Sequence, residues 1–198
     1  MDNPLEDREF GSWLEAHRDL LLEGTLALDL GCGLGDDARY MVGAGLQVIG
    51  TDLSVQRIAQ AAQRAKGASF VVANLVDGLP FRSGCAELVT ASLSLHYFDR
   101  RTTAKIVHDI ARVLQPGAVL LCRVNVVGET QALWGKGVEH EPDFFEVKPG
   151  RFKRFFTGDT LTETLQPCLS VESMWLEETR VLDEHRKTTL VAQARRRT

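Results

Sequence analysis

Three closely spaced glycines, Gly31, Gly33 and Gly35, follow a short apolar run near the N-terminus. Glycine allows a tight turn and a close backbone approach that a Cβ would block, and a helix after the turn adds free N–H groups. Such a turn suits a nucleotide or nucleoside, although an ordinary turn without a ligand is the alternative. The spacing is G-x-G-x-G, whereas dinucleotide-binding turns have G-x-G-x-x-G.

Two carboxylates accompany these glycines. Asp29 precedes Gly31 by two positions, where it would repel a pyrophosphate but attract a cation such as the sulfonium of S-adenosylmethionine. Asp52 ends the next apolar run, where a carboxylate can accept hydrogen bonds from both ribose hydroxyls. A charge that favours a helix N-terminus is the alternative role of Asp52. The spacings together predict S-adenosylmethionine as the cofactor.

Asn74 ends a third apolar run, where its side chain can hydrogen-bond the adenine amino group, unless it is simply a surface residue. Cys32 lies inside the glycine turn and is expected to be a small buried residue without chemistry of its own. The predicted cofactor site comprises Asp29, Gly31, Cys32, Gly33, Gly35, Asp52, Leu53, Asn74, Leu75 and Ser92.

Apolar runs alternate with amphipathic stretches, which is typical of buried parallel strands connected by helices. The pattern predicts strands at 25–30, 47–51, 69–73, 87–91, 118–124, 169–176 and 188–194, the last two joined by a charged turn. It predicts helices at 13–22, 37–42, 55–66, 102–114 and 157–165. Ser54 is a plausible N-cap for the third of these helices, and Gly67 ends it. We expect an α/β fold in a single domain over residues 1–198.

At these motifs the chain resembles the class I S-adenosylmethionine-dependent methyltransferases. Residues 27–35 look like their glycine-rich motif, 48–54 like the ribose-binding segment and 112–118 like the signature before the fifth strand. The resemblance implies a Rossmann-like, doubly wound sheet of seven strands, order 3-2-1-4-5-7-6, with strand 7 antiparallel. Residues 93–98 look like small-molecule members, such as the tellurite-resistance and methyltransferase type 11 groups. Asn74 and Glu87 replace aspartates that are common in the family.

His96 and Tyr97 are the candidate catalytic residues, because they follow the fourth strand at the carboxyl edge of the predicted sheet. Methyl transfer is an in-line displacement, so aligning the reactants and excluding water is the main task. A hydroxyl acceptor would also need a general base, whereas a thiolate or soft anion would not. The alternative is that His96 packs against the next helix and Tyr97 belongs to the core.

Substrate contacts are expected near the end of the fifth strand and in the segment after it. Arg123 and Asn125 end that strand; an arginine there either recognises an acidic acceptor or pairs within the protein, and internal pairing is the preferred interpretation. Residues 125–156 have no clear period and predict a long loop that caps the substrate. Trp134, His140 and Arg154 are its candidate contacts. Residues 139–141 lack the geometry of a metal site, so no metal is expected.

Composition limits the remaining functions. The chain has 23 Lys and Arg against 27 Asp and Glu, a formal net charge of -4, which does not favour nucleic-acid or membrane binding. The four cysteines are scattered singly, and residues 1–8 do not resemble a secretory signal, so a cytoplasmic protein is expected. We expect a small-molecule substrate and a monomer or homodimer. A catalytically silent cofactor-binding module, a nicotinamide-dependent oxidoreductase and a nucleic-acid methyltransferase remain alternatives.

Overall fold

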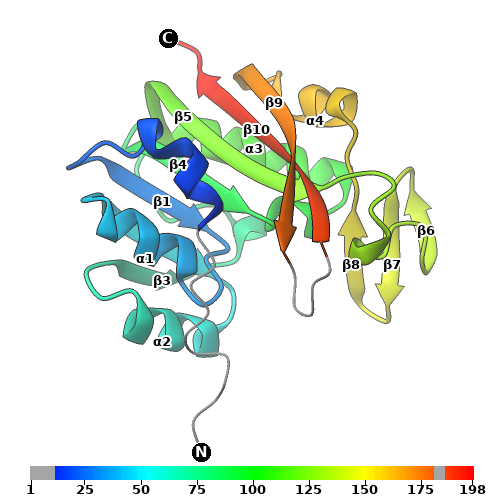
Figure 1. The fold of residues 1–198 in the computed structure, drawn as a ribbon. Coiled ribbons are helices and arrows are strands. Elements are labelled where there is room, and N and C mark those ends of the chain that lie inside the picture. Colours follow the sequence, from blue (N-terminus) through cyan, green and yellow to red (C-terminus); the bar gives the residue numbers. More distant parts are fainter. Residues whose placement is uncertain (1–11, 181–185) are drawn as a thin grey trace, which may run out of the picture.

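The central element is a seven-stranded sheet. The computed structural model describes residues 12–180 and 186–198 (Figure 1). The strands are β1 (Leu26–Leu30), β2 (Gln47–Asp52), β3 (Ser69–Val72), β4 (Ala86–Ser92), β5 (Leu114–Asn125), β9 (Leu169–Arg180) and β10 (Arg186–Arg196). Their order is β3-β2-β1-β4-β5-β10-β9. The first five pair in parallel, whereas β10 is antiparallel to both β5 and β9. This order and orientation confirm the predicted sheet.

Helices cover both faces of the sheet, because successive strand residues point to opposite sides and both sides are apolar. On one face, Leu28 and Leu120 belong to a cluster that also contains residues of α3 (Arg100–Val113) and α4 (Gly158–Leu165). On the other, Ala27 and Leu121 pack with residues of α1 (Asp36–Gly43) and of the 3-10 helix η1 (Trp13–Leu20). The predicted doubly wound arrangement is therefore confirmed.

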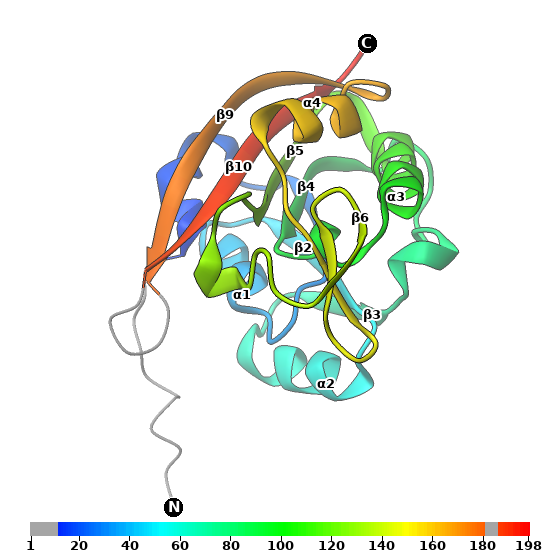
Figure 2. The same cartoon turned by 90° about the vertical axis from the view of Figure 1, so that its right-hand side faces the viewer.

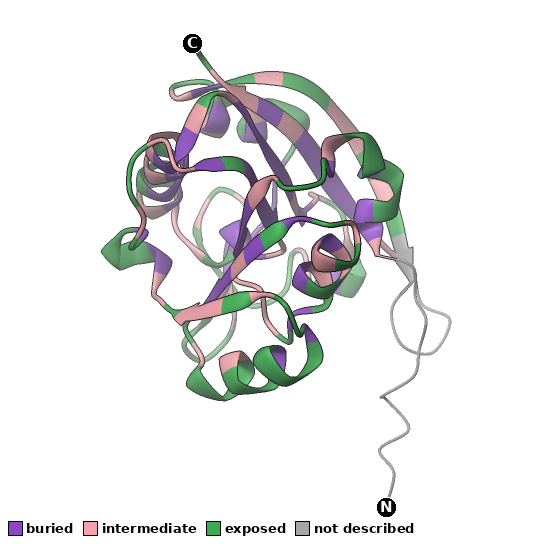
Figure 3. Cartoon of the chain, turned by 90° about the vertical axis from the view of Figure 1, so that its left-hand side faces the viewer, coloured by how far each residue is buried: buried purple, intermediate pink, exposed green. Residues whose placement is uncertain are grey.

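Helix α2 (Val55–Arg64) lies at the edge of the molecule (Figure 3), and Ala61 is its one buried residue. The predicted N-cap is confirmed, since the Ser54 hydroxyl accepts a hydrogen bond from the Arg57 N–H at 3.3 Å. The predicted helix 13–22 differs: it is a 3-10 helix over Trp13–Leu20, with non-helical dihedral angles at His17.

Residues 125–156 are not the structureless loop that the sequence predicts. They contain η4 (Thr130–Ala132) and a three-stranded antiparallel sheet of β6 (Val138–Glu141), β7 (Phe144–Lys148) and β8 (Arg151–Arg154). Figure 1 shows this small sheet to the right of the main sheet, and in Figure 2, viewed from that side, it lies in front. Buried Phe145, Phe155 and Ala132 form an apolar cluster of its own. The segment is thus an ordered structure next to η3 (Leu95–Tyr97).

No helix among the described residues has both the length and the apolar character needed to cross a bilayer. The N-terminal residues 1–8, on which the expectation of no secretory signal rests, lie outside the described residues. So do residues 181–185 of the predicted charged turn between β9 and β10.

Candidate functional site

The glycine turn joins β1 to α1, and close packing explains its first and third glycines. Gly31 has φ +72°, and an added Cβ would lie 2.6 Å from the Ser94 Cβ. Gly35 has φ +81°, and a Cβ there would lie 3.0 Å from the Ala61 Cβ of α2. An added Cβ at Gly33 would meet nothing within 4 Å. The backbone at Gly33 therefore faces open space.

Asp52, at the end of β2, is held against this turn. Its Oδ2 accepts a hydrogen bond from the Gly33 N–H at 3.0 Å, and its Oδ1 accepts one from the Ser54 N–H at 2.9 Å. The Arg57 guanidinium lies 3.9 Å from Oδ2. A carboxylate oxygen has lone pairs beyond those two bonds, so Asp52 can also accept hydrogen bonds from a ligand.

A cavity of about 490 Å³ opens at the carboxyl edge of the parallel strands, beside Asp52. Cofactor pockets in proteins usually span about 300–1,000 Å³. Six predicted cofactor residues line it: Gly31, Asp52, Leu53, Asn74, Leu75 and Ser92. Asp29, Cys32, Gly33 and Gly35 are not among its lining residues. The structure thus brings the ends of four strands, β1 to β4, around one cavity.

Asn74 caps the short 3-10 helix η2 (Leu75–Asp77), since its Oδ1 accepts a hydrogen bond from the Val76 N–H at 3.3 Å. An adenine amino group is a donor and would need this same oxygen. A carbonyl oxygen has two lone pairs, so the cap leaves room for one more bond.

The turn after β4 supplies cavity residues that the sequence interpretation missed. Leu93 lines the cavity with φ +52°, an unfavourable backbone conformation for a non-glycine residue, and its N–H donates to the Arg123 carbonyl at 2.9 Å. Ser94 lines it too, with a buried hydroxyl that has no partner among the described residues. Ser54, Arg57, Ala73 and Phe98 also line the cavity. Their position next to predicted strand ends was the signal that could have found them.

Asp29 lies in the core at the end of β1, with 1% of its surface exposed. Its Oδ1 accepts a hydrogen bond from the Thr90 hydroxyl at 3.0 Å, whereas Oδ2 has no partner among the described residues. Burial raises the pKa of Asp29, and repulsion from Asp37 adds to this effect. A cation nearby would relieve both penalties, which is the chemistry predicted for this carboxylate.

The two catalytic candidates differ in their surroundings. Tyr97 is 50% exposed and lines the cavity, so it does not belong to the core. His96 is buried and is not a lining residue; its ring packs 4.3 Å from the Tyr97 ring, centroid to centroid. Burial, together with Lys187 and Lys153, lowers the pKa of His96 well below its usual value, so the ring is neutral.

Arg123 is held within the protein. Its Nε donates to the Ser92 hydroxyl at 2.7 Å, and its guanidinium lies 4.8 Å from the centre of the Trp13 ring. Burial lowers the pKa of Arg123, while the nearby carboxylates of Asp37 and Glu177 oppose that shift. This geometry agrees with internal pairing. Asn125 is fully buried, and its side-chain amide has no partner among the described residues.

The remaining substrate candidates stabilise the small sheet. Trp134 Nε1 donates to Asp143 at 3.2 Å, and His140 contacts Glu146 at 3.2 Å. Arg154 is buried; it pairs with Glu141, and its Nε donates to the Phe98 carbonyl at 3.2 Å. None of these three candidates lines the large cavity.

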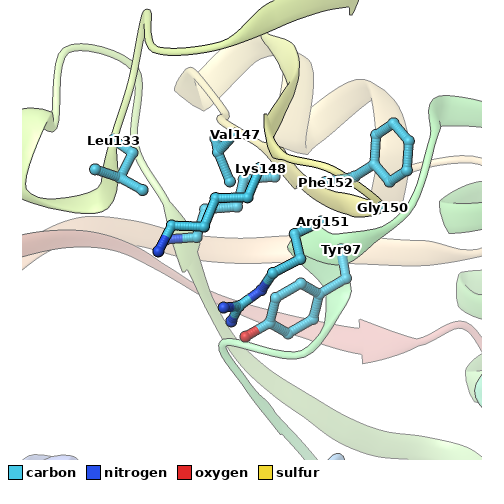
Figure 4. Close-up of a pocket in the computed structure, with 8 residues that line it drawn as sticks. Tyr97, Leu133, Val147, Lys148, Gly150, Arg151 and Phe152 are labelled. Carbon is cyan, nitrogen blue, oxygen red and sulfur yellow. The ribbon is translucent and has the colours of Figure 1, made fainter.

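A second pocket, of about 290 Å³, lies between η3 and the β7–β8 hairpin (Figure 4). Its lining residues are Tyr97, Leu133, Val147, Lys148, Gly150, Arg151, Phe152 and Lys153. Tyr97 is shared with the large cavity, so the two spaces adjoin at this side chain.

Comparisons with known proteins agree with this geometry. Residues 28–122 match the family model described as a methyltransferase domain. An uncharacterised methyltransferase of Synechocystis sp. is 33% identical over 96 residues, which are 48% of this chain and 45% of that protein. The chain spans about a third to a half of the length of the curated relatives that it matches.

Solved structures share the fold over most of the chain. A SAM-dependent methyltransferase from Methanosarcina mazei has a TM-score of 0.78 at 20% identity, covering 92% of this chain and 97% of that chain. The 1,6-didemethyltoxoflavin-N1-methyltransferase of Burkholderia thailandensis, solved with 1,6-didemethyltoxoflavin and S-adenosylhomocysteine, has a TM-score of 0.71 at 21% identity, covering 93% and 75%. These structures show that the chain shares their fold. Together with the methyltransferase-domain match, they bear out the predicted likeness to the S-adenosylmethionine-dependent methyltransferases.

Proposed function

We propose that this chain, similar in motifs and fold to the S-adenosylmethionine-dependent methyltransferases, transfers a methyl group from that cofactor to a small-molecule acceptor. The observation that carries the proposal is the cavity in which Asp52, Asn74 and the turn at Gly31 meet. Its volume, about 490 Å³, suits a nucleoside cofactor. We further propose a cytoplasmic protein, a monomer or homodimer in one domain, that binds neither nucleic acid nor a metal.

The residues fit the cofactor on chemical grounds. Asp52 can accept hydrogen bonds from ribose hydroxyls, and Asn74 can accept one from the adenine amino group. The hydroxyl of the lining residue Ser94, buried and without a partner among the described residues, is a polar atom that a ligand would satisfy.

When bound, S-adenosylmethionine supplies an electrophilic methyl group on a sulfonium. An acceptor atom would take that methyl group, and S-adenosylhomocysteine would be the product that leaves. The chain's task is alignment and exclusion of water. Tyr97 is the side chain best placed to orient the acceptor, because it lines both spaces. A neutral His96 behind it supports the Tyr97 ring.

A binding titration with S-adenosylhomocysteine, S-adenosylmethionine and NAD tests the cofactor. We expect the first two to bind and NAD not to bind; NAD binding alone would favour the oxidoreductase alternative. A screen of small acceptors that counts released S-adenosylhomocysteine then tests catalysis. Cofactor binding without turnover for any acceptor would favour the alternative of a catalytically silent cofactor-binding module. This alternative is worth testing because the candidate catalytic residue His96 is buried and does not line the cavity.

Tyr97→Phe removes only the hydroxyl and tests the proposed orientation of the acceptor. We expect kcat to fall about a hundredfold, the lower end of the range for loss of one positioned acid–base group, while affinity for S-adenosylhomocysteine is kept. Tyr40→Phe, on α1 away from the cavity lining, is the matched control. Equal kcat for Tyr97→Phe and wild type would remove the hydroxyl from the mechanism.

A further inference from the structure

The pocket between η3 and the β7–β8 hairpin is strongly cationic. Its lining includes Lys148, Arg151 and Lys153 and contains no carboxylate. Figure 4 shows the Arg151 and Tyr97 side chains, from different elements, extending into the same space. The chain as a whole has a net charge of -4, so this concentration of positive charge is local.

The acidic residues of the small sheet are engaged elsewhere. Glu141 pairs with Arg154, Glu139 accepts a hydrogen bond from the Asp143 N–H, and Glu146 accepts one from the Gly150 N–H at 2.8 Å. Glu141 therefore neutralises a cation outside the pocket, and neither Glu139 nor Glu146 forms an ion pair with Lys148, Arg151 or Lys153 among the described residues.

The cations of the pocket make no ion pair within the described part of the chain. The ion pairs there involve other residues. Lys153 is half-buried, and its Nζ donates to the Ala132 carbonyl at 3.0 Å, which fixes its position. Lys187 of β10 adds another charge nearby: burial and repulsion from Lys153 lower its pKa to about 8, while Glu129 opposes that shift. Like charges held close together favour an anion between them.

The pocket also has an apolar part. Phe152 is a lining residue, but its ring stacks on Phe144 and points away from Arg151 and Tyr97 (Figure 4). Leu133 and Val147 line the pocket together with Tyr97. These side chains suit a flat or apolar body, whereas the cations suit a compact oxyanion, and arginine can bind one through two hydrogen bonds. Tyr97 places this pocket next to the large cavity.

We infer that the methyl acceptor is a small anion: its carboxylate or phosphate contacts Lys148, Arg151 and Lys153, and its apolar body packs on Tyr97, Leu133 and Val147. This inference rests on the proposed function, since it assigns the acceptor of that reaction. It gives a role to the basic residues Arg151 and Lys153, which the cofactor site does not use.

The test measures binding of matched probes by calorimetry, with and without saturating S-adenosylhomocysteine. The probes are 4-hydroxybenzoate with its neutral amide, and phenyl phosphate with phenol. We expect at least one acid to bind ten times more tightly than its neutral counterpart, and more weakly as salt rises, because exposed charges are screened. Comparison of the two acids identifies the preferred oxyanion.

The variant Lys148→Gln/Arg151→Gln should reduce binding of that acid about tenfold and leave affinity for S-adenosylhomocysteine unchanged. Both side chains are exposed, so the fold should be retained. Arg101→Gln/Lys105→Gln, two exposed positions on α3, is the control with the same change in charge. Acids that bind no better than their neutral counterparts, or that bind the variant equally well, overturn the inference. Failure of S-adenosylhomocysteine to bind would instead contradict the proposed function.

Discussion

The backbone N–H of Gly33 donates a 3.0 Å hydrogen bond to Oδ2 of Asp52, so the glycine turn after β1 and the carboxylate after β2 form one unit. The Ser54 N–H holds the other oxygen at 2.9 Å. Both bonds orient the carboxylate before any ligand arrives. An oriented acceptor loses little freedom on binding, which favours affinity.

Asp52→Ala should weaken S-adenosylhomocysteine binding by about 1 to 3 kcal/mol, because charge-assisted hydrogen bonds to the ribose are lost. Asp52→Asn retains one carbonyl acceptor and should lose less. Isothermal titration gives both affinities. Asp19→Ala, an exposed position on η1, is the control. Unchanged affinity for Asp52→Ala would remove this residue from the cofactor site.

Gly31→Ala should destabilise the fold by about 1 to 3 kcal/mol, since the new Cβ adds a clash with Ser94 to an unfavourable φ. Gly33→Ala has the unfavourable φ alone and should cost less. Urea denaturation measures both. Adding Ser94→Gly to Gly31→Ala should recover part of the loss, and no recovery would contradict the clash as its cause.

Asp29→Asn should raise stability at alkaline pH. A carboxyl whose pKa is higher in the folded state binds its proton more tightly there, so its contribution to stability falls as pH rises above about 3.9, the unfolded value. The variant should therefore melt at a higher temperature than wild type at pH 8, and the difference should shrink toward pH 5. A difference of 1 kcal/mol corresponds to roughly 2–4 °C for a chain of this size. A difference in melting temperature between variant and wild type that stays the same from pH 5 to pH 8 would contradict the raised pKa of Asp29.

His96 should remain neutral where an ordinary histidine becomes charged. Burial and the two lysines that face it, Lys153 and Lys187, lower its pKa well below 6.5. The imidazole nitrogen resonances of His96 should thus be those of a neutral ring at pH 6, as measured by NMR. Since the folded state disfavours the charged ring, its stability should fall as pH drops through 6.5. A His96 midpoint near 6.5 would show that the ring is accessible to water.

The predicted cofactor residues at the carboxyl edge of the sheet could be identified from the sequence, because the patterns that indicate them are local. Strand β1, the turn at Gly31 and the N-cap at Ser54 each depend on adjacent residues. The position of Arg123 could not be predicted in the same way, since it depends on Trp13, a contact made by tertiary packing. The small sheet was missed because its strands are short and its pairing has register shifts at both interfaces, which obscure the alternation expected of strands.

The position of β10 between β5 and β9 has a consequence for how the chain acquires its shape. Asn125 of β5 pairs with Thr189 of β10, and Leu169 of β9 pairs with Arg196 of β10. Strands β5 and β9 can therefore form these pairings only after β10, which follows them in the sequence, has been synthesised. Until then β5 presents an unpaired edge, which is a template for association with other chains. Pairings between distant residues also form slowly. We therefore expect the N-terminal half to become ordered first. The seven-stranded sheet should be completed only when β10 has left the ribosome.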